Sequence, residues 1–271
     1  MKKLLFLVLL VLFVVGCYTH FTYTKLASEA PKHYDNLELG VPCPSDLVID
    51  REGYALGYST RNSQPLWVTY RLTDFEVTNR VCKRFGFFLA DPTVKEHFYV
   101  GASPEDYFRT GYDRGHMAPA ADMHWSTNAM LESFYMANIS PQTAFLNRNT
   151  WAMAEAFARE CAVKEGSVFI VTGPICTNDN PKTIGIGNVV VPDAFYKVIY
   201  DETPPEKMMA FVMPNAVPSL NMWLYATNVA YVEEITGYQF FPNLSTNLQQ
   251  ELKQKFDVRD WTVNHEEISV P

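Results

Sequence analysis

The stretch Tyr112-Asp113-Arg114-Gly115-His116 brings a carboxylate, a guanidinium, a glycine and an imidazole together within five residues. A histidine with an ordinary pKa near 6.5 can take a proton from water at physiological pH. Gly115 lets the backbone approach a ligand closely or adopt dihedral angles closed to other residues. A lone histidine is more often structural than catalytic, but these neighbours favour a catalytic role for His116. Asp113 and Arg114 are expected to fix this loop or to contact phosphate.

A second polar cluster, Asn138-Ile139-Ser140-Pro141-Gln142, is followed by Asn147 and Glu155. Residues 146–163 are rich in alanine and lack glycine and proline, so they predict a helix. Asn147 would lie near its start, where unpaired N–H groups and a partial positive charge suit phosphate. Asn147 and Glu155 would then lie two turns apart on neighbouring sides, with Trp151 between them as a packing anchor.

This spacing indicates a site for one hard metal ion. A neutral asparagine oxygen with mostly water ligands suits Mg²⁺, which prefers oxygen and gives up water reluctantly. Glu155 could accept hydrogen bonds from those waters and hold their geometry. The alternative for Asn147, taken alone, is a simple helix N-cap. With His116, the cluster predicts an enzyme that cleaves phosphodiesters.

Arg61 is the third element of the predicted site. It lies beside a predicted turn, residues 62–65, between the first two predicted strands. A planar guanidinium matches the geometry of phosphate. A single exposed arginine, taken alone, is more often a solvated turn residue.

The hydrophobic pattern predicts a single α+β domain, with strands interleaved with a few helices. Strands are expected at residues 47–58, 66–72, 167–172, 189–191, 195–200 and 208–213, and helices at 130–135, 146–163 and 221–236. Ser126, Thr127 or Asn128 could cap the first helix. Gly237 is expected to end the last one.

The N-terminus predicts export. Lys2-Lys3 precede an apolar run, residues 4–15, which has the size of a signal-peptide core and is short for a membrane span. Gly16-Cys17 resembles a bacterial lipoprotein cleavage box. Tyr18 follows the cysteine, and the absence of an aspartate there resembles the sorting rule for delivery to the outer membrane. An ordinary signal peptide or an uncleaved anchor is the alternative. We expect a signal peptide at 1–17, a tether at 18–44 and the catalytic domain at 45–271, on the periplasmic face or outer membrane.

If Cys17 carries lipid, four cysteines remain, and an even number in an exported protein permits two disulfides in any of three pairings. Buried free thiols are the alternative. The four are Cys43, Cys82, Cys161 and Cys176.

The net charge of −8, or about −10 without Lys2 and Lys3, argues against strong non-specific DNA binding through net charge. A local basic cleft could still act, with weaker and more salt-sensitive capture of substrate than in a basic relative. Six residues could supply that basic surface: Arg80, Lys83, Arg84, Arg109, Arg148 and Lys197. Asp122 and His124 are expected to belong to a loop and are not counted as metal ligands.

These motifs resemble the DNA/RNA non-specific endonucleases of the endonuclease G type, which have a ββα-metal active site. Residues 113–116 resemble the family signature, and residues 138–142, Asn147, Trp151 and Glu155 follow in the family's order and spacing. Stretches at 58–61, 67–68, 171–174, 191–197 and 211–215 resemble further family blocks. The resemblance covers roughly residues 45–245 and implies a central antiparallel sheet with helices packed on it.

The resemblance also implies the catalytic roles. His116 would be the general base that activates water. Asn147 would be the direct protein ligand of a single Mg²⁺, whose place Mn²⁺ could take. Glu155 would orient the water shell of that ion.

Substrate contacts follow from the same resemblance. Arg61 and Arg114 would bind the scissile phosphate and its developing charge, with Asp113 as a further substrate contact and Asn138 as a supporting polar group of the catalytic site. DNA and RNA would be cut to give a 5′-phosphate and a 3′-hydroxyl. The membrane would be contacted only through a lipid on Cys17.

Two other functions are weighed against this one. The first is a catalytically inactive lipoprotein that binds nucleic acid, which the joint presence of His116, Asn147 and Glu155 disfavours. The second is a phosphodiesterase for smaller or lipid-linked substrates, which comparison of long and small substrates would separate. A zinc peptidase is disfavoured because the chain has no His-Glu-x-x-His motif.

Overall fold

The computed structural model describes residues 34–98 and 101–261 of the chain. The predicted signal peptide, its Cys17 and residues 18–33 of the predicted tether lie outside the described residues and stay predictions. Among the helices of the described part, none is both long enough and apolar enough to cross a bilayer.

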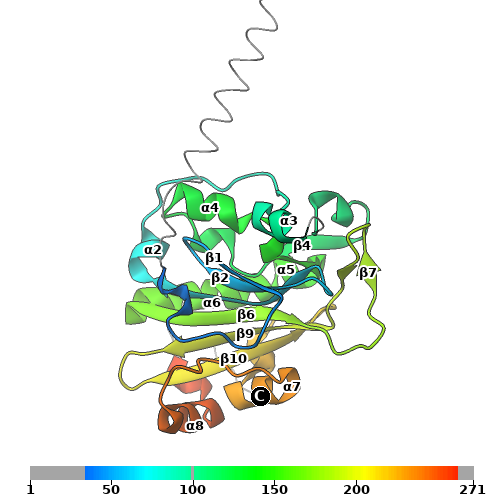
Figure 1. Cartoon of the computed structure of the whole chain (residues 1–271). Helices are drawn as coiled ribbons and strands as arrows, with labels where there is room; N and C mark the ends of the chain where they lie inside the picture. Colours follow the sequence, from blue (N-terminus) through cyan, green and yellow to red (C-terminus); the bar gives the residue numbers. More distant parts are fainter. Residues whose placement is uncertain (1–33, 99–100, 262–271) are drawn as a thin grey trace, which may run out of the picture. The chain divides into compact units, whose positions relative to one another are not determined.

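A seven-stranded sheet forms the centre of the fold, in the order β1-β2-β3-β6-β9-β10-β11 (Figure 1). Every neighbouring pair in it is antiparallel. Its strands are β1 Leu47–Asp50, β2 Ala55–Ser59, β3 Gln64–Thr73, β6 Ser167–Ile175, β9 Ala194–Asp201, β10 Lys207–Pro214 and β11 Ala226–Thr227. Two separate ribbons pair β4 Tyr112–His116 with β5 Ile139–Thr143, and β7 Thr183–Ile184 with β8 Val189–Val190.

Helices cover both faces of this sheet. They are α2 Asp74–Thr78, α3 Pro92–Phe98, α4 Thr127–Ser133, α5 Ala144–Arg148, α6 Thr150–Glu165, α7 Val229–Thr236 and α8 Thr246–Gln254. Short 3-10 turns lie at Asp35–Leu37, Pro104–Tyr107, Ala120–Asp122, Met136–Asn138, Met222–Tyr225 and Val258–Trp261. Figure 1 shows α4 above the strands and α7 and α8 below β10.

Strand alternation explains the two layers, because successive side chains of a strand point to opposite faces. Along β3, Val68 and Tyr70 join the buried cluster that α4 and α6 complete. Trp67 joins a second cluster, completed by Val229 of α7 and Leu252 of α8. The predicted α+β fold with a central antiparallel sheet and helices packed on it is therefore confirmed.

The first predicted strand is wrong in its extent. Residues 47–58 form two strands, β1 and β2, which pair with each other. Between them the chain reverses over Arg51-Glu52-Gly53-Tyr54, where Arg51 N–H donates to the carbonyl of Tyr54 at 2.9 Å. Arg51 is buried in this turn, where it forms an ion pair with Asp91 at 2.8 Å. The strands expected at 167–172, 195–200 and 208–213 are present as β6, β9 and β10.

The helix predicted at residues 146–163 is two helices, α5 and α6. They are separated at Asn149, whose backbone angles of φ −124° and ψ −94° are not helical. The Asn149 side chain donates to the carbonyl of Phe145 at 2.9 Å, which occupies an acceptor at the end of α5. Asn147 therefore lies in the last turn of a short helix and not at the start of a long one.

The C-terminal helix is shorter than predicted. Of residues 221–236, only Val229–Thr236 is α-helical, and Asn228 caps it by accepting from Tyr231 N–H. Ala226–Thr227 instead pairs with β10 as the edge strand β11. Gly237 ends α7 with a φ of +71°, as expected. The predicted cap of α4 is also correct, because the Ser126 hydroxyl accepts from backbone N–H groups of the first turn.

The folded domain includes residues that were expected to form a tether. Asn36 is buried and donates to the carbonyl of Arg51 at 2.7 Å. Leu37 and Leu39 pack against the α7 and α8 side of the sheet. Residues 34–44, which were expected to belong to the tether, are therefore part of the folded domain.

The four cysteines of the described chain are free thiols, so no disulfide is formed among them. Cys161 is buried in the cluster on the α6 face, and Cys82 packs against that cluster. Cys43 packs on the opposite face of the sheet. The sheet therefore separates Cys43 from both of them.

Candidate active site

His116 is the last residue of β4 and pairs with Ile139 of β5. Its ring lies against two phenylalanine rings, with its centroid 5.3 Å from Phe88 and 5.0 Å from Phe134. The residue is 7% exposed. Nε2 is enclosed and has no hydrogen-bond partner in the described part of the chain, which leaves Nδ1 as the ring nitrogen within reach of solvent.

Burial and a nearby cation keep this imidazole neutral. Removal from water, with the nearby Arg84 guanidinium acting in the same direction, lowers the pKa of His116 to about 3. Arg84 lies over the ring of Phe134, with Cζ 5.1 Å from the centroid. At neutral pH the ring therefore carries a lone pair and can accept a proton, as a general base must.

The same pKa shift predicts how stability depends on pH. Below pH 6.5 the unfolded chain binds a proton at this histidine that the folded chain does not bind, so folding loses free energy as pH falls toward 3. Wild type should therefore lose about 2 kcal/mol of unfolding free energy between pH 7 and pH 5 that His116→Gln does not lose. Urea unfolding at both pH values measures this, with His97→Gln, at an exposed imidazole, as background. An equal difference at the two pH values would contradict the buried, neutral state of His116.

Gly115 is required by packing between the two strands. A Cβ at this position would lie 2.2 Å from Oε1 of Gln142, which crosses over Gly115 from β5. The close approach is thus to a protein side chain and not to a ligand. The Gln142 amide is itself buried, and neither its oxygen nor its nitrogen has a partner among the described residues.

Asn138 holds the segment that follows His116. Its Oδ1 accepts from Ala118 N–H at 2.9 Å, and its Nδ2 donates to the carbonyls of Ala118 and Ser133, each at 2.9 Å. The side chain is fully buried. Asn138 is enclosed, and its contacts fix the backbone after the histidine; its role as a supporting polar group of the catalytic site stays a prediction.

Asp113 and Asn147 meet on the other side of β4. Asn147 Nδ2 donates to Asp113 Oδ2 at 2.9 Å, and Arg148 forms an ion pair with the same carboxylate at 2.7 Å. These bonds lower the pKa of Asp113 despite its partial burial. Asp113 was expected to contact substrate, but its carboxylate is already engaged and would repel phosphate. Its place in the structure is to orient Asn147.

Arg114 shares an aromatic neighbour with His116, because residues two apart on a strand point to the same side. Its Cζ lies 5.4 Å from the Phe88 centroid and 5.6 Å from the Tyr107 centroid. One terminal nitrogen donates to the carbonyl of Pro104 at 2.6 Å. The guanidinium is thus held between two rings beside His116. Its Nε is enclosed and has no partner in the described part of the chain, so the terminal nitrogens are the donors that could bind phosphate.

Glu155 lies on α6, one turn after the fully buried Trp151. Trp151 packs on Phe195 with centroids 5.6 Å apart, which confirms it as a packing anchor. Burial raises the pKa of Glu155 to about 7; the cations Lys197, Arg159 and Arg84 act in the opposite direction, and the Asp122 carboxylate adds to the rise. Glu155 is therefore poised between a neutral and an ionised state.

Lys197 is buried, although it was expected on a basic surface. It lies on β9 between Phe195 and Ile199, both of which point to the α6 face, so alternation sends Lys197 the same way. Its Nζ lies 4.8 Å from the Trp151 centroid and has no hydrogen-bond partner in the described chain. Burial lowers the pKa of Lys197, while the negative charges of Glu155 and Asp122 oppose that change.

Asp122 is structural, as expected. It is 1% exposed, accepts from Tyr70 Oη at 2.9 Å and forms an ion pair with Arg159 at 2.8 Å. Because Arg159 lies four residues after Glu155 on α6, this pair fixes the helix face that carries Glu155.

The donor set fits a metal ion held mainly by water. No group of three or more His, Cys, Asp or Glu side chains suited to a metal occurs in residues 34–98 and 101–261. Asn147, in contrast, is oriented by its bond to Asp113, which uses the amide nitrogen and leaves Oδ1 without a partner among the described residues. One neutral oxygen ligand with a water shell is compatible with Mg²⁺.

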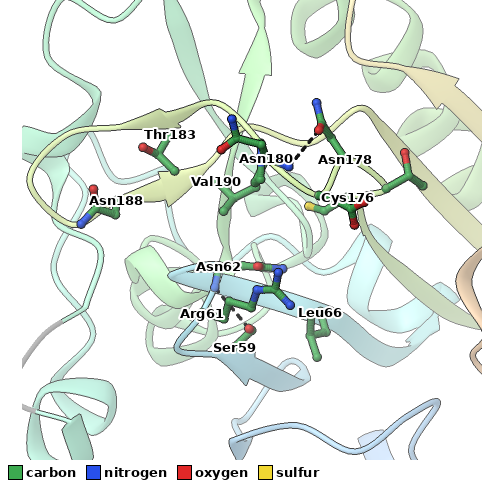
Figure 2. A pocket seen from close by; sticks show the side chains of 13 residues that line it. Ser59, Arg61, Asn62, Leu66, Cys176, Asn178, Asn180, Thr183, Asn188 and Val190 are labelled. Atoms are coloured by element: carbon green, nitrogen blue, oxygen red, sulfur yellow. Dashed lines mark hydrogen bonds between the residues drawn. The ribbon is translucent and has the colours of Figure 1, made fainter.

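Arg61 stands apart from this group. It is exposed in the turn between β2 and β3 and points into a pocket of about 540 Å³ (Figure 2). Of the described residues, those that line this pocket include no other predicted site residue. The structure therefore brings Asp113 to Asn147 and Arg114 to His116, whereas Arg61 belongs to a neighbouring cavity.

Sequence reasoning missed the residues that tune the site from a distance. Phe88 and Phe134 enclose His116, and no local pattern marks them. A lysine within the otherwise apolar stretch Phe195–Tyr200 was the one available signal for Lys197, because a charge inside a central strand requires a partner.

Comparison with known proteins identifies related chains. The sequence pattern described as DNA/RNA non-specific endonuclease matches residues 33–247. A nuclease of Nostoc sp. is 30% identical over 268 residues, covering 92% of this chain and 96% of that protein. The mitochondrial nuclease EXOG of Xenopus laevis is 33% identical over 236 residues, covering 81% of this chain. This chain spans 65% of the length of that EXOG protein.

A solved structure shares the fold. It is the crystal structure of an EndoG/EndoGI complex, which concerns the inhibition of EndoG. The TM-score is 0.72 at 30% sequence identity, with 80% of this chain and 95% of that chain covered. The likeness thus extends over nearly all of the related chain.

Proposed function

This chain belongs to the DNA/RNA non-specific endonuclease family, and from that membership we propose that it hydrolyses phosphodiester bonds of DNA and RNA without strong sequence specificity. The observation that carries the proposal is His116, a neutral imidazole with Nε2 enclosed and Nδ1 toward solvent. A nearby guanidinium, Arg114, supplies positive charge for a phosphate.

Each of these residues has one step in the reaction. His116 Nδ1 takes a proton from a water molecule while the water oxygen forms a bond to phosphorus. The bond between phosphorus and the 3′-oxygen breaks on the opposite side, and that oxygen takes up a proton from solvent. Arg114 holds the phosphate and its developing negative charge. The products are a 5′-phosphate and a 3′-hydroxyl.

Asn147 would hold the divalent ion through Oδ1, and Glu155 would accept hydrogen bonds from its bound waters. When bound, Mg²⁺, or Mn²⁺ in its place, supplies a Lewis acid that stabilises the charge of the phosphate and leaving oxygen. Glu155 serves this role best when ionised, and the charge of Lys197 favours that state.

The contact between Asp113 and Asn147 gives a test of this arrangement. Asp113→Ala removes the acceptor that orients the Asn147 amide, so the Mg²⁺ concentration for half-maximal rate should rise about 10-fold or more. Arg148→Ala is the matched control, because it removes the exposed ion pair and leaves the bond from Asn147 to Asp113. Titrating the rate with Mg²⁺ for both variants checks this, and equal curves would show that Asp113 does not orient the ligand.

The proposed activity is tested with the purified full chain in mild detergent. Supercoiled plasmid DNA and a structured RNA are incubated with Mg²⁺ and, separately, with excess chelator. Cleavage of both substrates only with the metal is the expected result. If the chain binds both and cuts neither, an inactive nucleic-acid-binding protein is the correct assignment. Cleavage only of a small chromogenic diester would indicate a phosphodiesterase for small substrates.

We further propose that the enzyme is exported and anchored by a lipid on Cys17, on the strength of the sequence at residues 1–17. Cells given a radiolabelled fatty acid should label the wild-type chain and not a Cys17→Ser variant. Equal labelling of both chains would reject the anchor.

A further inference from the structure

The pocket beside Arg61 has two walls from distant parts of the chain (Figure 2). One wall is the β2–β3 turn, with Ser59, Arg61 and Asn62. The other is the segment 176–190, which contains the β7–β8 ribbon. In Figure 2 the Arg61 side chain lies between the turn and the stretch that carries Asn178 and Asn180.

Hydrogen bonds fix the first wall against the β7–β8 ribbon. Val190 N–H donates to the Asn62 carbonyl at 3.1 Å, and Gln64 Nε2 donates to the Val190 carbonyl at 2.9 Å. The Ser63 hydroxyl donates to the Gly187 carbonyl at 2.7 Å. The ribbon and the turn are thus joined from three positions.

Asp193 fixes the second wall. Its Oδ2 accepts from Thr177 N–H at 2.8 Å and from Asn178 N–H at 3.2 Å. Asn178 Oδ1 in turn accepts from Asn180 N–H at 2.9 Å. Because both walls are fixed by bonds within the protein, the pocket is formed before any ligand enters it.

The pocket is joined to the strand that carries His116. The Ser140 hydroxyl donates to Oε1 of Gln64, three residues after Arg61. Ser140 lies on β5 directly opposite Gly115, the neighbour of His116. On the far wall, Lys182 Nζ donates to the Tyr112 hydroxyl at the start of β4, at 3.3 Å. Hydrogen bonds thus connect both walls of the pocket to the β4–β5 ribbon that ends at His116.

The lining has the chemistry of a nucleotide site. Arg61 offers a planar set of donors for a phosphate, and the exposed amides of Asn180 and Asn188 offer both donors and acceptors for sugar and base edges. The lining also includes the Asp179 carboxylate, which would repel a phosphate beside it but can accept from sugar hydroxyls or base N–H groups. Burial raises the pKa of Cys176 to about 12, so its thiol is neutral. A volume of about 540 Å³ lies within the usual range of small-molecule sites.

We propose that this pocket binds one nucleotide of the substrate strand next to the scissile bond, with Arg61 on its phosphate. The assignment rests on the proposed function and changes the role of Arg61 from a contact of the scissile phosphate to a contact of the adjoining one. The ligand class is a nucleoside monophosphate unit within a single strand, whose unpaired base can enter the pocket.

The test uses the full-length double variant Asn180→Ala, Asn188→Gly. Both side chains are exposed. Asn188 has a φ of +49°, so glycine keeps its backbone conformation while removing the amide. Asn247→Ala, at an exposed position on α8 across the sheet, is the matched control.

Rates are measured on oligonucleotides of two to six residues and on bis(4-nitrophenyl) phosphate, which has no adjoining nucleotide. For wild type and for Asn247→Ala, KM should fall as nucleotides are added. The double variant should lose that gain, with KM for the hexanucleotide about 3- to 10-fold higher and kcat unchanged, as expected for lost uniform binding. Its rate on the small diester should equal that of wild type.

Two results would overturn the assignment. If the double variant matches wild type on every oligonucleotide, or if it loses the same factor on the small diester, the pocket holds no adjoining nucleotide and the proposed nuclease activity still stands. If wild type hydrolyses none of the substrates, the proposed function fails, and the nucleotide site fails with it.

Discussion

His116→Gln is expected to lower kcat on plasmid DNA by about 10³-fold, with little change in KM. General base catalysis by a positioned side chain contributes 10²- to 10⁴-fold in enzymes, and glutamine cannot take a proton from water. The imidazole acts in the reaction without binding the rest of the substrate, so the loss should appear in kcat. Initial rates at saturating and low DNA concentrations separate the two constants.

The control for this experiment is His97→Gln, an exposed histidine at the end of α3. It should keep wild-type activity. Thermal unfolding at pH 7 shows whether His116→Gln remains folded, since the site is enclosed by Phe88 and Phe134. A folded His116→Gln protein that keeps more than a tenth of wild-type kcat would mean that His116 is not the base.

Asn147→Ala should have the second large effect. Removing the amide removes the single protein ligand proposed for the metal ion, so the rate at low Mg²⁺ should fall about 10²-fold. Loss of a residue that only supports a metal ligand already costs about 10- to 100-fold in metal affinity or activity, and loss of the ligand itself should cost at least as much. The rate should recover in part as Mg²⁺ is raised, because the other ligands are water and substrate. Rate against Mg²⁺ concentration, from micromolar to tens of millimolar, measures this.

Asn147→Asp makes that experiment sharper. The new carboxylate supplies oxygen ligands but cannot donate to Asp113, and it would lie in the place of an amide now 2.9 Å from that carboxylate. Repulsion between like charges should leave its activity between those of Asn147→Ala and wild type. If Asn147→Ala needs no more Mg²⁺ than wild type, the metal is held elsewhere.

The sequence carried enough information to predict the segments whose chemistry is local. The stretch from Tyr112 to His116 and the stretch from Asn138 to Gln142 were recognised separately, and they prove to be the two paired strands of one ribbon. The cap at Ser126 and the end of α7 at Gly237 also depend only on neighbouring residues. In each case the residues that indicate the structure lie in the same short segment as the structure itself.

The features that were missed depend on contacts between distant segments. The lysine at 197 looks like a surface charge until α6 is seen to cover that face of the sheet with Trp151. The break at Asn149 is invisible to helix propensity, because its neighbours are all compatible with a helix. The paired bonds of Asn138 join Ala118 and Ser133, which no local pattern connects.

The break at Asn149 has a consequence for how the enzyme responds to heat. Asn147 belongs to α5, which packs on α6, β4 and β5, whereas Glu155 belongs to α6, which also packs on β3, β6 and β9. The two groups proposed to serve the metal are therefore carried by two different helices, and local opening of α5 away from α6 would separate them. On warming, the demand for Mg²⁺ should rise while the central sheet is still intact, so the metal requirement reports the loosening of α5 before the whole domain melts.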